Sequence, residues 1–549
     1  MKIWYGKTET CVDAGCQVQT ALEALGVTLD GVIAARRGGQ VLEMTYKLTG
    51  DGELVPLTVA DDEGRRIYER SVRFVLLLAL RRLYPHQQVR VEYSVGHGVF
   101  VRLPGRMLNA AEIAIIEAEM HRICSEDMPF RREVWTLADA IAYFEKDGQM
   151  DKVALLKHRP YQYFTMYGCG GMWEYFYGAM AASTGAVDVF ALKPLQEGFV
   201  VQLPSAESPD APAPYIERPQ HLSVFAQSAG WCRILGVNNA ADLSAMLEKG
   251  DMREFIRINE ALHDKVISDI ADDIARRGAR VILVAGPSSS GKTTFAGRLS
   301  VHLRVLGYHP VKVSLDDYYL DRDKIPLEPD GTVDLERIDT LDLPLLQQQV
   351  MALLRGERVE LPRFSFKTGK REPKGEWLQL SDDQPLIIEG IHGLNPALLE
   401  GVPEEVQHRV FVSALTCLNL DDHNRIRTTD VRLLRRTVRD NQFRGTPPRE
   451  TLDMWPSVRK GEETWIFPHQ ERAHSMFNTA LHYELPFLKT RAYELLQKIE
   501  PDDPCYLPAR RLLKVLNYVP DAAASLESEI PPTSILREFI GGSTFDAAD

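Results

Sequence analysis

The spacing of hydrophobic positions changes several times along the chain, and each change predicts a different kind of element. Residues 1–61 combine short alternating stretches such as VLEMTYKL with one helical segment, VQTALEALG, which predicts a small sheet crossed by a helix. Residues 63–84 carry apolar side chains at helical spacing, residues 89–103 alternate with period two around a glycine, and residues 110–124 are again helical in pattern. The first half is therefore expected to mix helices with small sheets.

The second half begins with helical spacing and then turns to buried strands. ADLSAMLEKG and HDKVISDIADDIARRG have helical periodicity, and the second ends at Gly278, a typical helix stop. VILVA, residues 281–285, is a short apolar run of the kind that forms a buried parallel strand. With the proline-rich stretch 204–219 as a domain edge, we expect units at 1–61, 62–240, 241–278 and 279–549.

GPSSSGKT, residues 286–293, matches the phosphate-loop pattern G-x-x-x-x-G-K-[ST] between a predicted strand and a predicted helix. Glycines at both ends allow the backbone N–H groups to turn toward phosphate oxygens, and the lysine can reach the β- and γ-phosphates. The threonine hydroxyl of Thr293 is of the type that ligates Mg²⁺. The expected ATP-binding residues here are Gly286, Ser288, Ser289, Ser290, Gly291, Lys292, Thr293 and Thr294.

Two carboxylates follow further predicted strands. Asp316 comes after VKVSL, at the end of a strand where ligands of open α/β sheets lie, and can act as a general base toward a hydroxyl. The dipeptide Asp316-Asp317 is also compatible with a simple turn. Glu389 ends the apolar stretch PLIIE and is suited to a Mg²⁺ contact, direct or through water.

Four arginines lie at helical spacing in DVRLLRRTVRD: Arg432, Arg435, Arg436 and Arg439. Such a face can close over transferring phosphates, and it can equally be a solvated basic helix.

The composition favours a folded protein and argues against some classes of function. The 64 basic and 77 acidic residues give a net charge of −13, which opposes nonspecific nucleic-acid binding by the chain as a whole. The 7 cysteines form no C-x-x-C pair, so neither a disulfide framework nor a cysteine zinc site is indicated. The start of the chain lacks the apolar core of a signal peptide and the longest nearby apolar run is FVLLLAL, so we expect a cytoplasmic protein.

Six segments taken together resemble the uridine kinase and phosphoribulokinase family of P-loop kinases: GPSSSGKTT, SLDDYY, TVDLERIDTLD, PRFSFKTGKR, IIEGIHGL and DVRLLRRTVRD. The resemblance implies that Asp316 is the general base, that Lys292 is catalytic, that Thr293 and Glu389 handle Mg²⁺, and that the arginine helix is a lid. It also implies acceptor contacts from Tyr319, Asp334, Phe364 and Arg432, with Asp334 and Arg432 at positions that hold ribose hydroxyls.

The sequence departs from this family where uridine kinases read the pyrimidine. Phe364 and Gly369 stand at the positions of the family's Tyr and His, so the pentose contacts are retained and the base reader is lost. Uridine as the acceptor is therefore in doubt.

The first half resembles a different family. Residues 1–61 are similar to the ubiquitin-like TGS module, and residues 62–240 are similar to the editing domain that follows it in threonyl-tRNA synthetases. The four positions at which that domain carries its histidine and cysteine ligands hold Arg70, Phe74, Phe176 and Met180 here, none of which can serve as that ligand. Residues 241–278 are then a helical connector.

We therefore expect an α/β protein whose C-terminal kinase domain contains a parallel sheet, preceded by a β-grasp-like module and an α+β editing-like domain. The expected function is ATP- and Mg²⁺-dependent phosphorylation of a hydroxyl on a nucleoside or related pentose-containing small molecule. The alternatives are a kinase for a phosphosugar or another small alcohol, and an RNA-binding or regulatory protein that uses ATP as a switch. RNA contact would fall in the N-terminal half, a membrane is not an expected partner, and the sequence leaves a homo-oligomer open.

Overall fold

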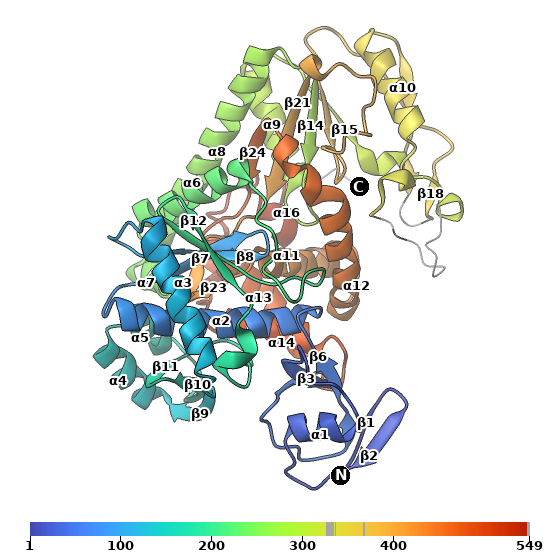
Figure 1. The fold of residues 1–549 in the computed structure, drawn as a ribbon. Coiled ribbons are helices and arrows are strands. Elements are labelled where there is room, and N and C mark those ends of the chain that lie inside the picture. Colours follow the sequence, from blue (N-terminus) through green and yellow to red (C-terminus); the bar gives the residue numbers. More distant parts are fainter. Residues whose placement is uncertain (326–333, 335, 366–367, 546–549) are drawn as a thin grey trace.

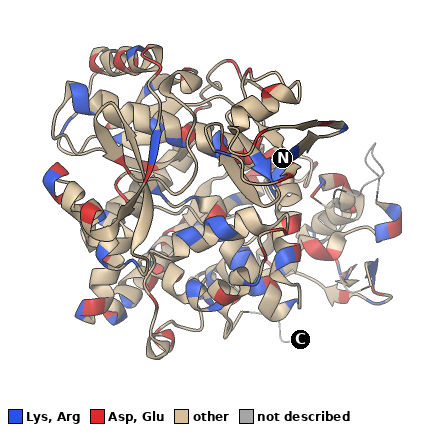
Figure 2. Ribbon diagram, turned by 90° about the horizontal axis from the view of Figure 1, so that it is seen from below, with Lys and Arg blue, Asp and Glu red and all other residues tan. Residues whose placement is uncertain are grey.

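The computed structural model describes residues 1–325, 334, 336–365 and 368–545. The chain forms an upper part around a parallel sheet, a middle part of helices and antiparallel strands, and a small N-terminal module at the bottom (Figure 1). Basic and acidic residues are interspersed over the elements seen from below (Figure 2). No helix in the described part of the chain has the length and apolar character required to cross a membrane.

The N-terminal module contains one helix and two three-stranded sheets, so the predicted sheet is in fact divided in two. Strand orders are β2-β1-β5 and β4-β3-β6. The elements are β1 (Lys2–Tyr5), β2 (Thr8–Cys11), α1 (Val18–Ala24), β3 (Ala34–Arg37), β4 (Gln40–Glu43), β5 (Gly52–Glu53) and β6 (Val55–Leu57). Its core joins Ile3 with the apolar face of α1, Val18 and Leu22, and is separate from the larger cores.

The middle part has two antiparallel sheets and the long buried helix α2. The four-stranded sheet has the order β12-β13-β8-β7 and the three-stranded sheet the order β11-β10-β9. The elements are α2 (Asp62–Leu83), β7 (Arg90–Val95), β8 (Gly98–Arg102), α3 (Ala110–Ser125), β9 (Arg131–Thr136), α4 (Leu137–Asp147), α5 (Met150–Lys157), β10 (Tyr163–Cys169), β11 (Met172–Glu174), β12 (Ala191–Leu195), β13 (Gly198–Gln202), α6 (Pro219–Leu235) and α7 (Ala240–Lys249).

The upper part is a five-stranded sheet of order β15-β20-β14-β21-β24, in which every pair of neighbours is parallel. A parallel sheet brings the carboxyl ends of its strands to one edge, so the loops after β14, β15 and β20 meet there. The first elements are α8 (Met252–Arg277), β14 (Val281–Ala285), α9 (Lys292–Val305), β15 (Val311–Ser314), α10 (Leu343–Leu354), β20 (Leu386–Glu389), β21 (Gln407–Ser413) and β24 (Ser475–Asn478). Between α10 and β20 lie short strands β16 (Val359–Leu361), β17 (Phe364–Ser365), β18 (Lys370–Arg371) and β19 (Glu376–Leu378).

Further helices pack beside this sheet: α11 (Thr428–Phe443), α12 (Pro448–Gly461), α13 (Glu484–Gln497), α14 (Tyr506–Leu516), α15 (Ala524–Glu527) and α16 (Arg537–Ile540). The predicted connector is indeed helical, but α8 does not merely link two domains. Its residues Phe255, Ile267 and Ile274 share one hydrophobic core with α9, β14 and α13. Because that core also contains residues of α4 and α5, the middle and upper parts are packed together.

Buried ion pairs also join the two parts, through the hairpin β22 (Asn419–Asp421) and β23 (Asn424–Arg425). Glu69 on α2 accepts from Arg425 and Arg427, at 3.1 and 2.6 Å. Lys152 on α5 is buried beside Glu174 and Asp421, at 3.2 and 3.4 Å. Removing one member of such a pair leaves a buried charge uncompensated. These contacts therefore fix the position of the hairpin relative to the middle part.

Candidate active site

The phosphate loop, residues 286–293, connects β14 to α9 in a conformation that its small residues permit. A Cβ atom on Gly286 would lie 1.9 Å from the Val412 carbonyl oxygen, and Gly291 has a φ of +84°. Ser289 adopts a φ of +57°, which non-glycine residues rarely take outside functional loops. The buried hydroxyls of Ser289 and Ser290 have no hydrogen-bond partner among the described residues. Unused donors at the start of a helix suit an anionic ligand.

Lys292 and two carboxylates meet at the edge of the sheet next to this loop. Lys292 Nζ donates to the Pro287 carbonyl oxygen at 3.2 Å. Burial lowers the pKa of Lys292, while Glu389 and Asp316 oppose that effect. Burial, and then the charge of Asp316, raises the pKa of Glu389 to about 7. The ends of β15, β20 and β14, which are neighbours in that order, thus bring Asp316, Glu389 and Lys292 together at one edge of the sheet.

Asp316 follows β15 and is exposed to solvent. Protein nevertheless surrounds its side chain closely enough that desolvation raises its pKa, against the lowering effect of Lys292. A raised pKa makes a carboxylate a stronger proton acceptor.

The donors near the loop fit Mg²⁺ held partly by other ligands. Thr293 is exposed in the first turn of α9, and Glu389 and Asp316 supply carboxylate oxygens, the ligand type that Mg²⁺ prefers. Within the described ranges, no group of three or more His, Cys, Asp or Glu side chains is arranged to hold a metal. The residues therefore match a Mg²⁺ ion that keeps waters and binds substrate phosphates.

The arginines of α11 divide into two pairs. Arg436 Nη1 donates to Ser288 Oγ at 3.0 Å. Arg439 forms an ion pair with Asp440 at 2.7 Å and lies close enough to Lys292 and Asp316 to lower the pKa of each. Arg436 thus contacts the phosphate loop, and Arg439 lies near its lysine.

Arg432 and Arg435 are buried, and their roles toward the acceptor and the nucleotide stay predictions. Arg432 is 1% exposed, paired with Glu462, and donates through Nε to the Ser288 carbonyl oxygen at 2.9 Å. Arg435 is 0% exposed and bonded to Glu484 and Thr479. Helical spacing spreads an arginine run over more than one face, and buried acids distant in sequence hold these two inside. Arg432 contacts the phosphate loop directly, and Arg435 contacts it through Thr479, which donates to the Ser290 carbonyl oxygen.

The acceptor-side residues gather beyond β15. The rings of Tyr319 and Phe364 lie 5.8 Å apart between centroids. Asp334 Oδ1 accepts from the Glu336 N–H at 3.0 Å, and the Phe364 N–H donates to Asp317 Oδ1 at 3.1 Å. Gly369 has a φ of +67°, and a Cβ there would lie 2.5 Å from Arg322 Cδ. Glycine is therefore required at 369 by both backbone and space, and no base-reading side chain can occupy that position.

Several site residues were missed by sequence reasoning. Burial, followed by the charge of Glu462, raises the pKa of Glu336 to about 7. His392 is buried, its ring nitrogens have no hydrogen-bond partner in the described part of the chain, and burial lowers its pKa to about 4. His392 follows Glu389 within EGIHG and was thus detectable, Glu336 stands within TVDLERIDTLD without a role assigned to it, and Glu462 lies in none of the six segments.

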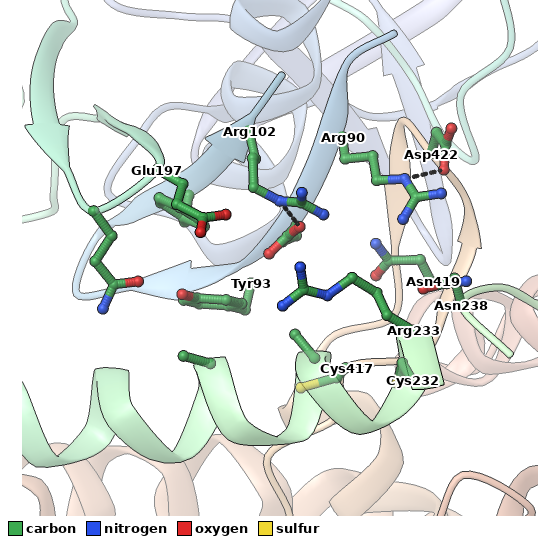
Figure 3. A pocket seen from close by; sticks show the side chains of 15 residues that line it. Arg90, Tyr93, Arg102, Glu197, Cys232, Arg233, Asn238, Cys417, Asn419 and Asp422 are labelled. Atoms are coloured by element: carbon green, nitrogen blue, oxygen red, sulfur yellow. Dashed lines mark hydrogen bonds and ion pairs between the residues drawn. The ribbon is translucent and has the colours of Figure 1, made fainter. Parts of the chain in front are cut away.

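A cavity of about 240 Å³ lies elsewhere, between the four-stranded sheet, α6 and the β22 strand. Arg90 pairs with Asp422 at 3.1 Å and Arg102 with Glu92 at 2.8 Å across its wall (Figure 3). These two pairs neutralise four of the six charged residues that line the cavity. Little uncompensated charge is therefore left in the cavity to bind a charged ligand.

Comparison with known proteins agrees with the geometry of the phosphate loop. Residues 281–484 match the Phosphoribulokinase / Uridine kinase family. This stretch of the chain is thus similar to the kinases of that family. Similar solved structures include a putative fructose transport system kinase from Silicibacter sp., at 20% identity and TM-score 0.28, covering 38% of this chain and 98% of that one. A possible uridine kinase from Bacillus stearothermophilus is 20% identical with TM-score 0.26, covering 39% and 98%.

The N-terminal region is similar to threonine-tRNA ligases. The ligase of Carboxydothermus hydrogenoformans is 28% identical over 162 residues, 29% of this chain and 26% of the ligase. That of Desulforamulus reducens is 29% identical over 129 residues, 23% and 20% of the two chains. The chain spans about a quarter of the length of these relatives.

The four editing-type positions form a filled apolar contact in the ligase-like half. Phe74 and Phe176 are buried with ring centroids 6.1 Å apart, and Phe74 also contacts Phe130 at 5.2 Å. Met180 is fully buried, and Arg70 Nε donates to the Ala179 carbonyl oxygen at 3.0 Å. Two of the four positions thus hold aromatic rings, and the other two hold Arg70 and Met180.

We expect the purified full-length chain to contain no stoichiometric zinc and to release no amino acid from mischarged tRNA, because these side chains supply neither imidazole nor thiolate. Elemental analysis after dialysis against buffer without chelator measures the first, and a deacylation assay with a threonyl-tRNA synthetase as positive control measures the second. One tightly held zinc per chain would contradict this expectation.

Proposed function

We propose that the protein transfers the γ-phosphoryl group of ATP to a hydroxyl of a nucleoside or related pentose-containing small molecule. The observation that carries the proposal is the convergence of Asp316 and Glu389 on Lys292 beside a phosphate loop with unused buried donors. A nucleotide switch has no need of a carboxylate facing an acceptor cleft, which is why we favour a kinase.

Each residue has a defined part in the transfer. The loop N–H groups and Lys292 hold the β- and γ-phosphates, and Arg436 and Arg439 approach from α11. Asp316 takes the proton from the attacking hydroxyl, a step that its raised pKa favours. Mg²⁺, when bound near Thr293 and Glu389, neutralises charge on the phosphates. Catalysis of this kind depends mainly on positioning and on electrostatic stabilisation.

The residues on the acceptor side favour a pentose as substrate, with little selectivity for the base attached to it. Asp334 supplies a carboxylate for hydroxyls, whereas Phe364 offers an apolar face and Gly369 offers no side chain. With Arg432 buried against Glu462, Asp334 is the remaining predicted hydroxyl contact. The lack of a base reader keeps a phosphosugar or another small alcohol as the second candidate for the acceptor.

We expect shallow discrimination among uridine, cytidine and adenosine, and a clear preference for substrates with both ribose hydroxyls. Loss of one charge-assisted hydrogen bond costs about 1.5–3 kcal/mol, or roughly 10- to 100-fold in kcat/KM. Steady-state kcat/KM for uridine, cytidine, adenosine, 2′-deoxyuridine and free ribose tests both statements. A strong preference for uridine would contradict the inference that Phe364 and Gly369 do not recognise the base. Equal kcat/KM for uridine and 2′-deoxyuridine would contradict the role of Asp334 in binding the ribose hydroxyls.

A further inference from the structure

The C-terminal tail, residues 530–545, packs directly on the phosphate loop and its helix. Ile535, Leu536 and Phe539 belong to the same buried core as α9 and α13. A Cβ on Gly291 would lie 2.6 Å from Ile535 Cγ2, and a Cβ on Gly297 would lie 2.5 Å from Phe545 Cδ1. The glycines of the loop and of α9 therefore permit the close approach of the tail as well as the turn itself.

One tail carboxylate is bonded to the nucleotide-binding end of α9. Glu538 Oε2 accepts from the Thr294 N–H at 3.2 Å and from Thr294 Oγ1 at 2.8 Å. Thr294 is the third residue of α9, so its N–H has no partner within the helix. In phosphate loops the free N–H groups at this helix end are the ones that bind phosphate oxygens. A carboxylate oxygen of the chain itself thus occupies one anion position.

The negative charge of Glu538 affects the pKa of two other charged residues of the site. It acts to raise the pKa of Lys292 and that of Glu389. With Asp316 and Glu389 already present, Glu538 adds a third negative charge where phosphates have to bind. Like charges at short distance in a partly desolvated site repel one another strongly.

The tail is also tied to the arginine helix. Gln442 Nε2 donates to the Ile540 carbonyl oxygen at 3.3 Å, and the Arg435 guanidinium lies 4.9 Å from the centre of the Phe539 ring. The helix that carries Arg436 and Arg439 is therefore in direct contact with the tail.

We propose that the tail is a built-in competitor of the nucleotide, in which Glu538 occupies a phosphate position on Thr294 and has to withdraw before the nucleotide binds fully. This rests on the proposed function, that residues 286–294 bind ATP. Because Gln442 and Arg435 of α11 contact the tail, withdrawal of the tail also changes the packing of α11. In this way the chain's own terminus limits the affinity for nucleotide.

The test is the affinity for the β,γ-imido analogue of ATP with Mg²⁺, measured by titration calorimetry on the full-length chain. Glu538→Gln removes the charge and keeps an acceptor, and Glu538→Ala removes both. We expect binding to tighten in that order, by about 10-fold for Glu538→Ala, the scale of one charge-assisted hydrogen bond. Glu529→Gln is the matched control, because Glu529 is the residue just before the tail and its carboxylate is paired with Arg257 on α8 at 2.9 Å. That variant should bind as the wild type does.

Hydrogen exchange gives a readout independent of affinity. Backbone amides of residues 535–545 should exchange faster when the wild-type chain is saturated with the analogue. Binding that is equal or weaker in both Glu538 variants, or slower exchange of the tail in the complex, would overturn the competitor role while leaving nucleotide binding intact. Failure of every chain, wild type included, to bind the analogue would instead overturn the proposed function and the competitor role that rests on it.

Discussion

Asp316→Asn is expected to lower kcat by about 10²- to 10⁴-fold, the usual contribution of a general base, while the affinity for ATP changes little. The amide keeps the size of the side chain but accepts no proton from the attacking hydroxyl. Because desolvation raises the pKa of the wild-type carboxyl, the native group is a stronger base than an ordinary aspartate. Single-turnover transfer to the acceptor, together with calorimetric ATP binding, separates the chemical step from nucleotide binding.

Asp317→Asn is the matched control for this experiment. Asp317 is adjacent in sequence, but its Oδ1 accepts the Phe364 N–H at 3.1 Å, and an asparagine oxygen can still do so. We expect this variant to retain kcat within a few-fold. A near wild-type rate for Asp316→Asn with the true acceptor would show that another group takes the proton.

Lys292→Met is expected to weaken ATP binding and to lower kcat/KM by about 10²- to 10³-fold, the scale measured for one preorganised donor at developing negative charge. Methionine retains most of the length of the side chain and removes the cation that stands between Glu389 and Asp316. Without it, the two carboxylates and the phosphates repel one another. Steady-state kinetics over a range of ATP concentrations, with calorimetry, measures both effects.

Lys312→Met provides the control, since Lys312 is an exposed lysine on β15 that does not face the loop. Its kcat/KM should equal that of the wild type. The melting temperature of Lys292→Met should stay close to the wild-type value, because burial already disfavours the charged lysine. Equal kcat/KM for Lys292→Met and the wild type would remove the phosphate loop from the mechanism.

The ligase-like half has a structural connection to the kinase site through α2. Glu69 holds Arg427, and Arg66 lies 3.6 Å from Asp430, at the first turn of the helix that carries Arg436 and Arg439. Such buried pairs fix the start of α11 relative to α2. The two halves therefore share one packed interface at the base of the lid. RNA contact by the N-terminal half remains a prediction.

The phosphate loop was predictable because its chemistry is local. A strand, two glycines, Lys292 and Thr293 stand next to one another in sequence, and the backbone geometry that each requires limits the choice of residue. The same holds for Asp316 and Glu389, which end strands of a parallel sheet and so had to meet at its edge. The α/β fold class followed from the alternation of apolar strands and helices.

The faces of α11 could not be assigned from its spacing. Arg432 and Arg435 share a pattern with Arg436 and Arg439, and it is their pairing with Glu462 and Glu484, which lie 30 and 49 residues further along, that holds their guanidinium groups in the interior. Long-range pairing of this kind has no local signal, because the energy of a buried ion pair depends on distance and desolvation in the folded chain.

The sequence by itself thus predicted the phosphate-loop motif, the parallel sheet and, at Arg70, Phe74, Phe176 and Met180, side chains without imidazole or thiolate, since each depends on residue type at a local position. Tertiary structure alone decided which arginine side chains are buried and that Arg322 leaves no space for a side chain at Gly369. It also decided that Glu538 accepts a hydrogen bond from Thr294, 244 residues earlier in the chain. These outcomes depend on which side chains, distant in sequence, are buried next to one another. Hydrophobic packing of the whole chain decides which side chains these are.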